Sequence, residues 1–305
     1  ITVGLATSIR TTSIGKTADY VNGTTAYSSA TAVGQQGTGV DGSALATGDL
    51  SILVGSASTV GVVASVDNSS GTGNVGRTAA SAYSKAQAIN GSGISNLTAV
   101  ADTTAVFEFV AITDTASTYT LNINSQAVYS ADGTAISGSQ FATAVNANAA
   151  LTGVTASFDS GTNRITLSAS DGRNITVSQT TGAAVAGLGQ GLTTTSTPSL
   201  NNSVNDALVA TTTAQDTAVS NVYVGTIRLT STEAITLSGA TETRIGYADN
   251  SALALGASAL NSASVTSVAN ANTAIGRIDA ALTTVSNLRS TFGSIQNRFE
   301  SVISN

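Results

Sequence analysis

Chemistry in this chain would have to rest on carboxylates and hydroxyls, because its 305 residues include no histidine and no cysteine. Their absence excludes His-dependent catalytic triads, thiolate nucleophiles, disulfides and the usual zinc sites. Several aspartates stand in turn-like stretches rich in Gly, Asn and Ser, where a carboxylate usually caps the local backbone. These aspartates are Asp67, Asp102, Asp114, Asp132, Asp159 and Asp171. Acid–base catalysis needs two carboxylates in one cleft, so we expect turn capping and no enzyme.

One stretch matches a binding motif by letter, and two others are considered for calcium. Residues Gly71 to Gly76 read Gly-Thr-Gly-Asn-Val-Gly, the pattern of a dinucleotide-binding loop. No acidic residue in the required context follows about twenty positions later, so we interpret the stretch as a loop. Calcium could bind near Asp67 to Asn74 or near Asp171 to Asn174, but neither stretch has the spacing of a calcium loop. The sequence therefore predicts no cofactor and no metal.

The charged residues are sparse and narrow the choice of partners. The chain has 11 basic and 17 acidic residues, a net charge of −6. Its basic residues are scattered singly, so nucleic acid is not an expected partner. No apolar run reaches the roughly 18 residues of a membrane span. Tyrosines could form sugar-binding platforms if exposed, and a surface glycan stays a possible partner, although half-buried strand positions are the alternative. The tyrosines are Tyr20, Tyr27, Tyr83, Tyr119, Tyr129, Tyr223 and Tyr247.

The strongest pattern lies in the last forty residues, Ser264 to Asn305. Apolar residues recur there at steps of three and four, with one discontinuity between Val285 and Leu288, and no proline interrupts the run. This spacing predicts one amphipathic helix with a coiled-coil seam, roughly 57 Å long, that needs partner helices. The seam, the predicted self-assembly site, consists of Ile275, Ile278, Leu282, Val285, Leu288, Phe292, Ile295, Phe299 and Val302.

The segment from Asn270 to Asn305 resembles the carboxy-terminal rod helix of bacterial flagellin. The parts that carry the resemblance are Ile278 to Leu282, Leu288 to Ser290 and Gln296 to Glu300. The resemblance implies a homopolymer of flagellin subunits outside the cell, with hook-associated and cap proteins as further partners. A flagellin would also have helices before the variable region and a further helical segment after Asn305. We therefore expect a trimmed flagellin.

A strand and helix pattern occurs twice in the middle of the chain. The first copy has strands at 50–54 and 60–66, a turn at 67–76, a helix at 78–90 and a strand at 105–110. The second has strands at 119–124 and 127–129, a turn at 132–133, a helix at 139–149 and strands at 164–169 and 174–179. Within it, Leu121 to Asn124, Ala144 to Asn146 and Gly153 to Ala156 resemble the flagellin hook insertion motif.

These patterns predict an α+β fold with a long C-terminal coiled-coil-type helix as a rod domain and β-rich outer domains built from two small α+β modules. We expect a strand at 1–12 and a linker within 1–47, module 1 at 48–115 and module 2 at 116–195. A return linker with strands follows at 196–250, after a boundary near Pro198, and the rod helix occupies 251–305.

The predicted function is that of a structural subunit of the flagellar filament. It would assemble by helix packing along the seam, with the outer domains exposed. Two alternatives stay open: a flagellin-like cell-surface protein that binds an extracellular polysaccharide, and a hook-associated junction protein.

Overall fold

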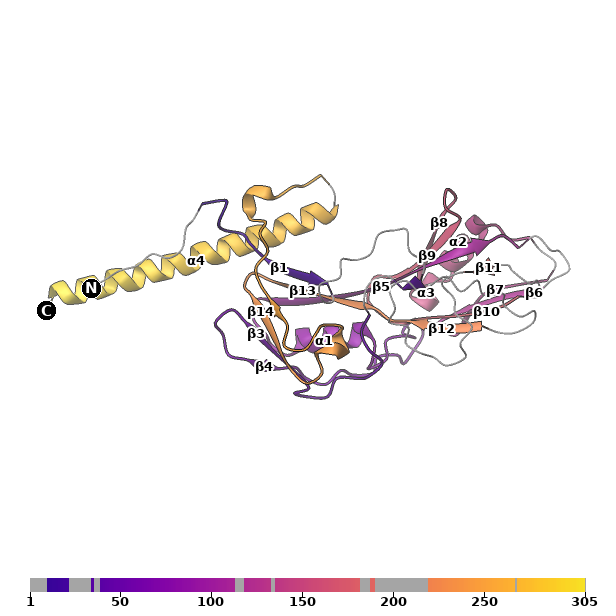
Figure 1. The fold of residues 1–305 in the computed structure, drawn as a ribbon, viewed down its shortest axis with the longest axis horizontal. Helices are drawn as coiled ribbons and strands as arrows, with labels where there is room; N and C mark the ends of the chain where they lie inside the picture. Colours follow the sequence, from indigo (N-terminus) through magenta and orange to yellow (C-terminus); the bar gives the residue numbers. More distant parts are fainter. Residues whose placement is uncertain are drawn as a thin grey trace.

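Three antiparallel sheets and one long C-terminal helix make up the described part of the molecule (Figure 1). This computed structural model describes residues 10–21, 34–35, 39–112, 118–132, 135–181, 187–189, 219–266 and 268–304. The expected strand at 1–12 and the expected boundary at Pro198 lie wholly or mostly outside these residues.

The largest sheet runs along the body and has seven strands, in the order β1-β13-β5-β9-β8, with β2 and β11 also paired to β5. Its strands are β1 (Ala18–Val21), β2 (Gly34–Gln35), β5 (Leu97–Val110), β8 (Thr155–Asp159), β9 (Arg164–Ala169), β11 (Gly187–Leu188) and β13 (Thr226–Ser231). Strand β5 is long enough to pair with β13 through its first half and with β9 through its second half.

Two four-stranded sheets face different halves of this long sheet. One has the order β15-β14-β3-β4, with β3 (Leu50–Val54), β4 (Val60–Gly61), β14 (Ile235–Gly239) and β15 (Ala252–Leu253). The other has the order β12-β10-β6-β7, with β6 (Thr118–Ile123), β7 (Gln126–Asp132), β10 (Ile175–Thr181) and β12 (Val219–Tyr223).

Each half of the long sheet shares a core with one small sheet and one helix. The alternating burial of Leu50, Ile52 and Val54 in β3 shows why these residues form a strand with one face in the core. We call the described residues within 18–102 and 224–253 the base unit, whose core includes helix α1 (Ala82–Gly91). We call the described residues within 103–223 the outer unit, whose core includes helix α2 (Gly138–Ala147).

Local capping fixes the ends of these helices. The Ser81 hydroxyl accepts a hydrogen bond from the Ser84 N–H at the start of α1. A capping box between Ser137 and Gln140 starts α2. A short helix α3 (Ala149–Thr152) follows and ends at Gly153, which takes a left-handed conformation with φ of 68°.

The short 3-10 helix η1 (Glu242–Ile245) lies within the base unit, between β14 and β15. A second one, η2 (Leu260–Ser262), lies between the base unit and α4 (Val268–Ser304), a helix of 37 residues. Figure 1 shows α4 starting above β1 and β13 and then projecting beyond the sheets.

The predicted α+β fold class with a coiled-coil rod domain is wrong. The described residues form mostly β-sheet, and no second helix among them lies along α4. Two modules in series are not found either, because β13 and β14 follow the outer unit in sequence but pair with β5 and β3. Long-range strand pairing, which local periodicity does not encode, explains the difference.

Candidate assembly surface on the C-terminal helix

The first part of α4 is held to the body by small residues and backbone contacts. Ala274, Ala280 and Ala281 are buried. The Arg277 Nη1 donates to the Ser262 hydroxyl at 2.9 Å. A Cβ placed on Gly15 would lie 2.7 Å from the Arg277 carbonyl oxygen, so only glycine allows this close approach. Alanines and a glycine therefore set how closely the helix docks.

The predicted seam residues lie on α4, and most of them are exposed. The exposed fraction is 58% for Ile275, 60% for Leu282 and 49% for Phe299. Ile278, Val285, Phe292 and Val302 are also exposed, whereas Leu288 and Ile295 are half-buried. Exposed large apolar side chains that recur along one helix are a feature of interaction surfaces, so this stripe is the candidate site.

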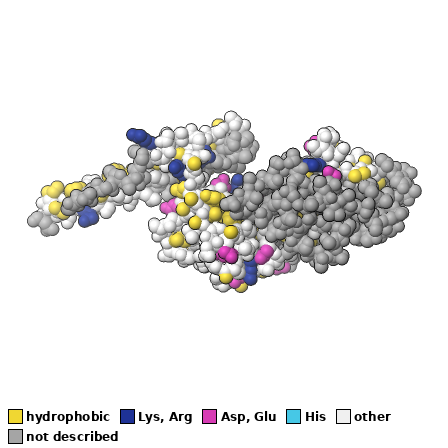
Figure 2. Space-filling view, in the orientation of Figure 1, with side chains coloured by type: hydrophobic (Ala, Val, Ile, Leu, Met, Phe, Trp, Pro, Cys, Tyr) yellow, Lys and Arg dark blue, Asp and Glu magenta, His cyan; other side chains and the backbone are white. Residues whose placement is uncertain are grey.

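The projecting part of α4 presents this stripe to solvent over a long distance. At about 1.5 Å per residue, a helix of 37 residues is roughly 55 Å long. Figure 2 shows hydrophobic side chains along the projecting helix. Cβ atoms placed on Gly276 and Gly293 would meet nothing within 4 Å, so there is open space at both positions.

The predicted turn role of the aspartates fits Asp67 and Asp159. Asp67 accepts hydrogen bonds from the Ser69 hydroxyl and N–H, which lower the pKa of its carboxyl. Asp159 accepts from the Thr162 hydroxyl and the Gly161 N–H, which likewise lower its pKa. Burial instead raises the pKa of Asp102, although the Thr226 hydroxyl opposes this shift. Asp114 lies outside the described residues.

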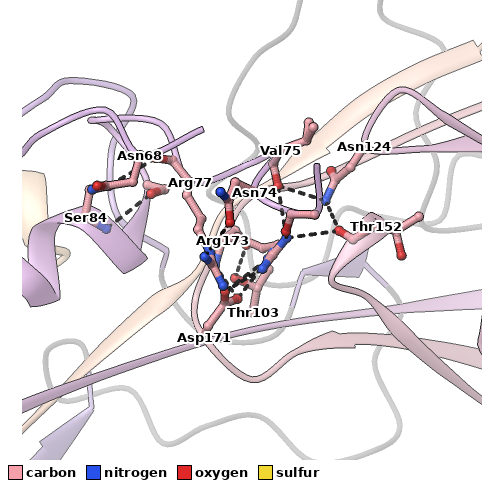
Figure 3. A network of polar contacts seen from close by, with 12 residues as sticks. Asn68, Asn74, Val75, Arg77, Ser84, Thr103, Asn124, Thr152, Asp171 and Arg173 are labelled. Atoms are coloured by element: carbon pink, nitrogen blue, oxygen red, sulfur yellow. Dashed lines mark hydrogen bonds and ion pairs between the residues drawn. The ribbon is translucent and has the colours of Figure 1, made fainter. Parts of the chain in front are cut away.

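Arg173 joins the outer unit to the base unit through a buried polar network, which Figure 3 shows from close by. Its side chain is only 4% exposed. The Nη1 atom donates to the carbonyl oxygens of Gly73 at 2.6 Å, Val75 at 3.3 Å and Thr152 at 3.3 Å. The loop that matches the dinucleotide motif by letter is therefore a docking loop between the two units.

Asp171 is the anion of this network. It accepts from Arg173 Nη2 at 2.8 Å and from Arg77 Nε at 2.9 Å. Burial alone would raise the pKa of Asp171, but hydrogen bonds and charge from Arg173, with a further bond from Arg77, hold it below its usual value. Because its oxygens are engaged by two arginines, Asp171 serves the junction and is not placed as a general base.

A second buried cation, Lys85, ties α1 to two distant segments. Its ammonium donates to the Asp41 carbonyl at 2.9 Å, the Asp41 carboxylate at 3.3 Å and the Arg244 carbonyl at 2.6 Å. Burial lowers the pKa of Lys85 to about 8, while the Asp41 charge opposes that change. Neither Lys85 nor Arg173 was among the predicted site residues, because most of their acceptors are backbone carbonyls with no sequence signature.

An open cleft of about 570 Å³ lies beside the junction, between α1 and β5. Tyr83, Gln87 and Asp171 contribute side chains to its lining, and the Arg77 guanidinium lies 4.6 Å from the centre of the Tyr83 ring. The other described tyrosines present less ring surface to a sugar. Tyr119, Tyr223 and Tyr247 are buried, and Tyr20 and Tyr129 are half-buried. Tyr27 lies outside the described residues.

Among the described residues, no cluster of three or more acidic side chains could hold a metal ion. The helices of that same part of the chain include none with the length and apolarity to cross a bilayer. Comparison of the chain with protein-family models and with curated proteins finds no match.

Proposed function

We propose that this protein is a structural subunit of a bacterial flagellar filament and that it assembles outside the cell through the exposed apolar stripe of α4. The observation that carries the proposal is this stripe itself, which runs from Ile275 to Val302 with most of its residues exposed. The resemblance of the same segment to the flagellin rod helix supports the assignment.

The occupant of the stripe is the helical part of neighbouring copies of the chain. Repeated steps of three and four let equivalent helices interdigitate along their length. Burying one Leu, Val, Ile or Phe side chain stabilises an assembly by about 1.5–3 kcal/mol. The seven exposed positions are 37–60% exposed, so each would gain about half of that value, and the stripe supplies part of the free energy that holds subunits together against the entropic cost of association.

The test compares seam and off-seam substitutions in the full chain and in a version with added terminal helices. Leu282→Asp and Phe292→Asp should prevent higher assemblies, measured by sedimentation velocity and electron microscopy. Ser290→Asp and Ser294→Asp lie about 160° from Phe292 around the helix, and Asn287→Asp lies about 140° from Leu282. Each adds the same charge on an exposed position away from its seam residue, so they serve as controls. Assembly that survives Leu282→Asp and Phe292→Asp would refute the proposal.

A second candidate function is the binding of an extracellular polysaccharide, which the cleft beside Tyr83 favours. Hydroxyl-rich ligands suit clefts that combine an aromatic ring with amide and carboxylate groups. Calorimetric titration of neutral and acidic oligosaccharides into the parent and Gln87→Ala proteins tests it. Equal affinity in both proteins would exclude the cleft as the binding site.

A further inference from the structure

The base and outer units have the same strand pairings. In the base unit, β3 pairs with β4 and β14, and β14 pairs with β15. In the outer unit, β6 pairs with β7 and β10, and β10 pairs with β12. The long sheet repeats the match: β13 lies between β1 and β5, and β9 lies between β5 and β8.

The match extends to register and to sequence. Ile52 opposite Leu237 corresponds to Ile123 opposite Val177. The strands that carry the second members of these pairs read Ile235-Thr-Leu-Ser and Ile175-Thr-Val-Ser. Two unrelated folds are not expected to share both this strand register and this four-residue sequence.

An asparagine near the end of each helix makes the same pair of hydrogen bonds. Asn90 donates to the Ala99 carbonyl and accepts from the Ala99 N–H, both at 2.8 Å. Asn146 donates to the Ala156 carbonyl at 2.9 Å and accepts from the Ala156 N–H at 2.8 Å. In both units the amide thus occupies the free edge of the strand that follows the helix. Ala99 and Ala156 are therefore equivalent positions.

The two units differ in the connection that follows the strand of each equivalent alanine, three residues after Ala99 and Ala156. Three residues on, Asp159 lies opposite Arg164, and a four-residue turn, 160–163, joins them. The equivalent pair in the base unit is Asp102 opposite Thr226. In the base unit, residues 103–225 connect this pair, and they contain the whole outer unit. In the outer unit, the four-residue turn 160–163 makes the equivalent connection.

We infer that the fold is duplicated and nested, and that this β-hairpin is an insertion site which accepts a complete folded domain. The base unit holds the outer unit there. The same site in the outer unit, at Gly161, is exposed and carries only a turn, so it is free to hold a further domain. This inference does not depend on the assembly role of α4.

The geometry explains why the hairpin tolerates insertion. Its two strands are already paired at Asp159 and Arg164, so the ends of an inserted chain leave the sheet side by side. The Asp159 carboxylate accepts hydrogen bonds from the turn residues Gly161 and Thr162. By contrast, the turn between β6 and β7 contains Asn124, which is fully buried and bonds to Thr152 and Thr176.

The experiment inserts one small folded domain, with the same short flexible linkers, into the full chain at Gly161 or between Asn124 and Ser125. Hydrogen exchange measured by mass spectrometry then reports on β6, β9 and β10. The Gly161 insertion should leave their protection within about threefold of the parent, whereas the Asn124 insertion should reduce it at least tenfold. Equal loss of protection at both sites would overturn the inference.

A second measurement tests the duplication without any insertion. Ile52→Val and Ile123→Val delete one methyl group at matched, fully buried positions. Each should speed exchange about 2- to 10-fold, as an Ile to Val change usually does. The effect should stay within the substituted unit, because an inserted domain opens separately from its host. Acceleration of both units by either substitution would show a single cooperative fold and overturn the inference.

Discussion

Replacing Arg173 with methionine should weaken the contact between the outer unit and the docking loop of the base unit, and so lower the free energy of unfolding. The substitution keeps much of the aliphatic length but removes the donors that reach Gly73, Val75 and Thr152. It also removes the closer of the two arginines that hold Asp171. The three carbonyl oxygens then lose a charged donor in a place that water reaches poorly.

The expected loss in free energy of unfolding is about 3 kcal/mol. Breaking a buried ion pair by deleting one partner costs about 3–5 kcal/mol, because the remaining charge is left unpaired. The lower end applies here, since the Asp171 side chain is 25% exposed and keeps its bond to Arg77. A loss of about 3 kcal/mol corresponds to a change of roughly 150-fold in the unfolding equilibrium.

The matched control is Arg228→Met. Arg228 forms an ion pair with Asp19 at 3.1 Å, but its side chain is 51% exposed. Such a surface pair contributes at most about 1 kcal/mol. Urea unfolding followed by circular dichroism gives both values from the shift in midpoint at constant slope. A loss for Arg173→Met that is no larger than that for Arg228→Met would show that the buried network does not hold the units together.

Three further predictions concern polar side chains of the two units. The folded-state pKa of Lys85, about 8, lies below its unfolded value. The free energy of unfolding should therefore rise between about pH 8 and 10, by up to about 1.4 kcal/mol per pH unit. Urea titrations at several pH values should show that Lys85→Met removes this rise. Burial raises the pKa of Asp102, so Asp102→Asn should increase Tm at pH 7, and calorimetry at pH 3 should show little difference. Asn90→Ala and Asn146→Ala should each cost about 1–3 kcal/mol in urea unfolding, because a strand N–H and C=O lose their partner.

Short-range signals located many of the elements. The strands expected at 50–54 and 164–169 coincide with β3 and β9, where apolar and polar residues alternate. The helix expected at 78–90 begins later, at Ala82, because Ser81 caps it. The strand expected at 105–110 begins at Leu97, since Asn90 holds Ala99 in extended conformation.

The pairing of distant strands could not be predicted from the same signals. Strands β13 and β14 were expected to return to the base of the molecule, but nothing local shows that they complete sheets begun by β5 and β3. The resemblance between Ile235-Thr-Leu-Ser and Ile175-Thr-Val-Ser was the available clue. The long C-terminal helix could be predicted because helical spacing is local, whereas Arg173 binds backbone carbonyls far away in sequence.

The nesting of the two units has a consequence for the order in which the chain folds. Two pairings of the outer unit, β6 with β7 and β8 with β9, are short hairpins, as between Asp159 and Arg164, so their loops close at low entropic cost. The base unit must bring Asp102 to Thr226 across the whole intervening chain. A folded outer unit holds those two residues near each other, and its prior folding should therefore speed the closure of the base unit. The outer unit is in this sense an internal folding aid for the part of the molecule that carries the helix.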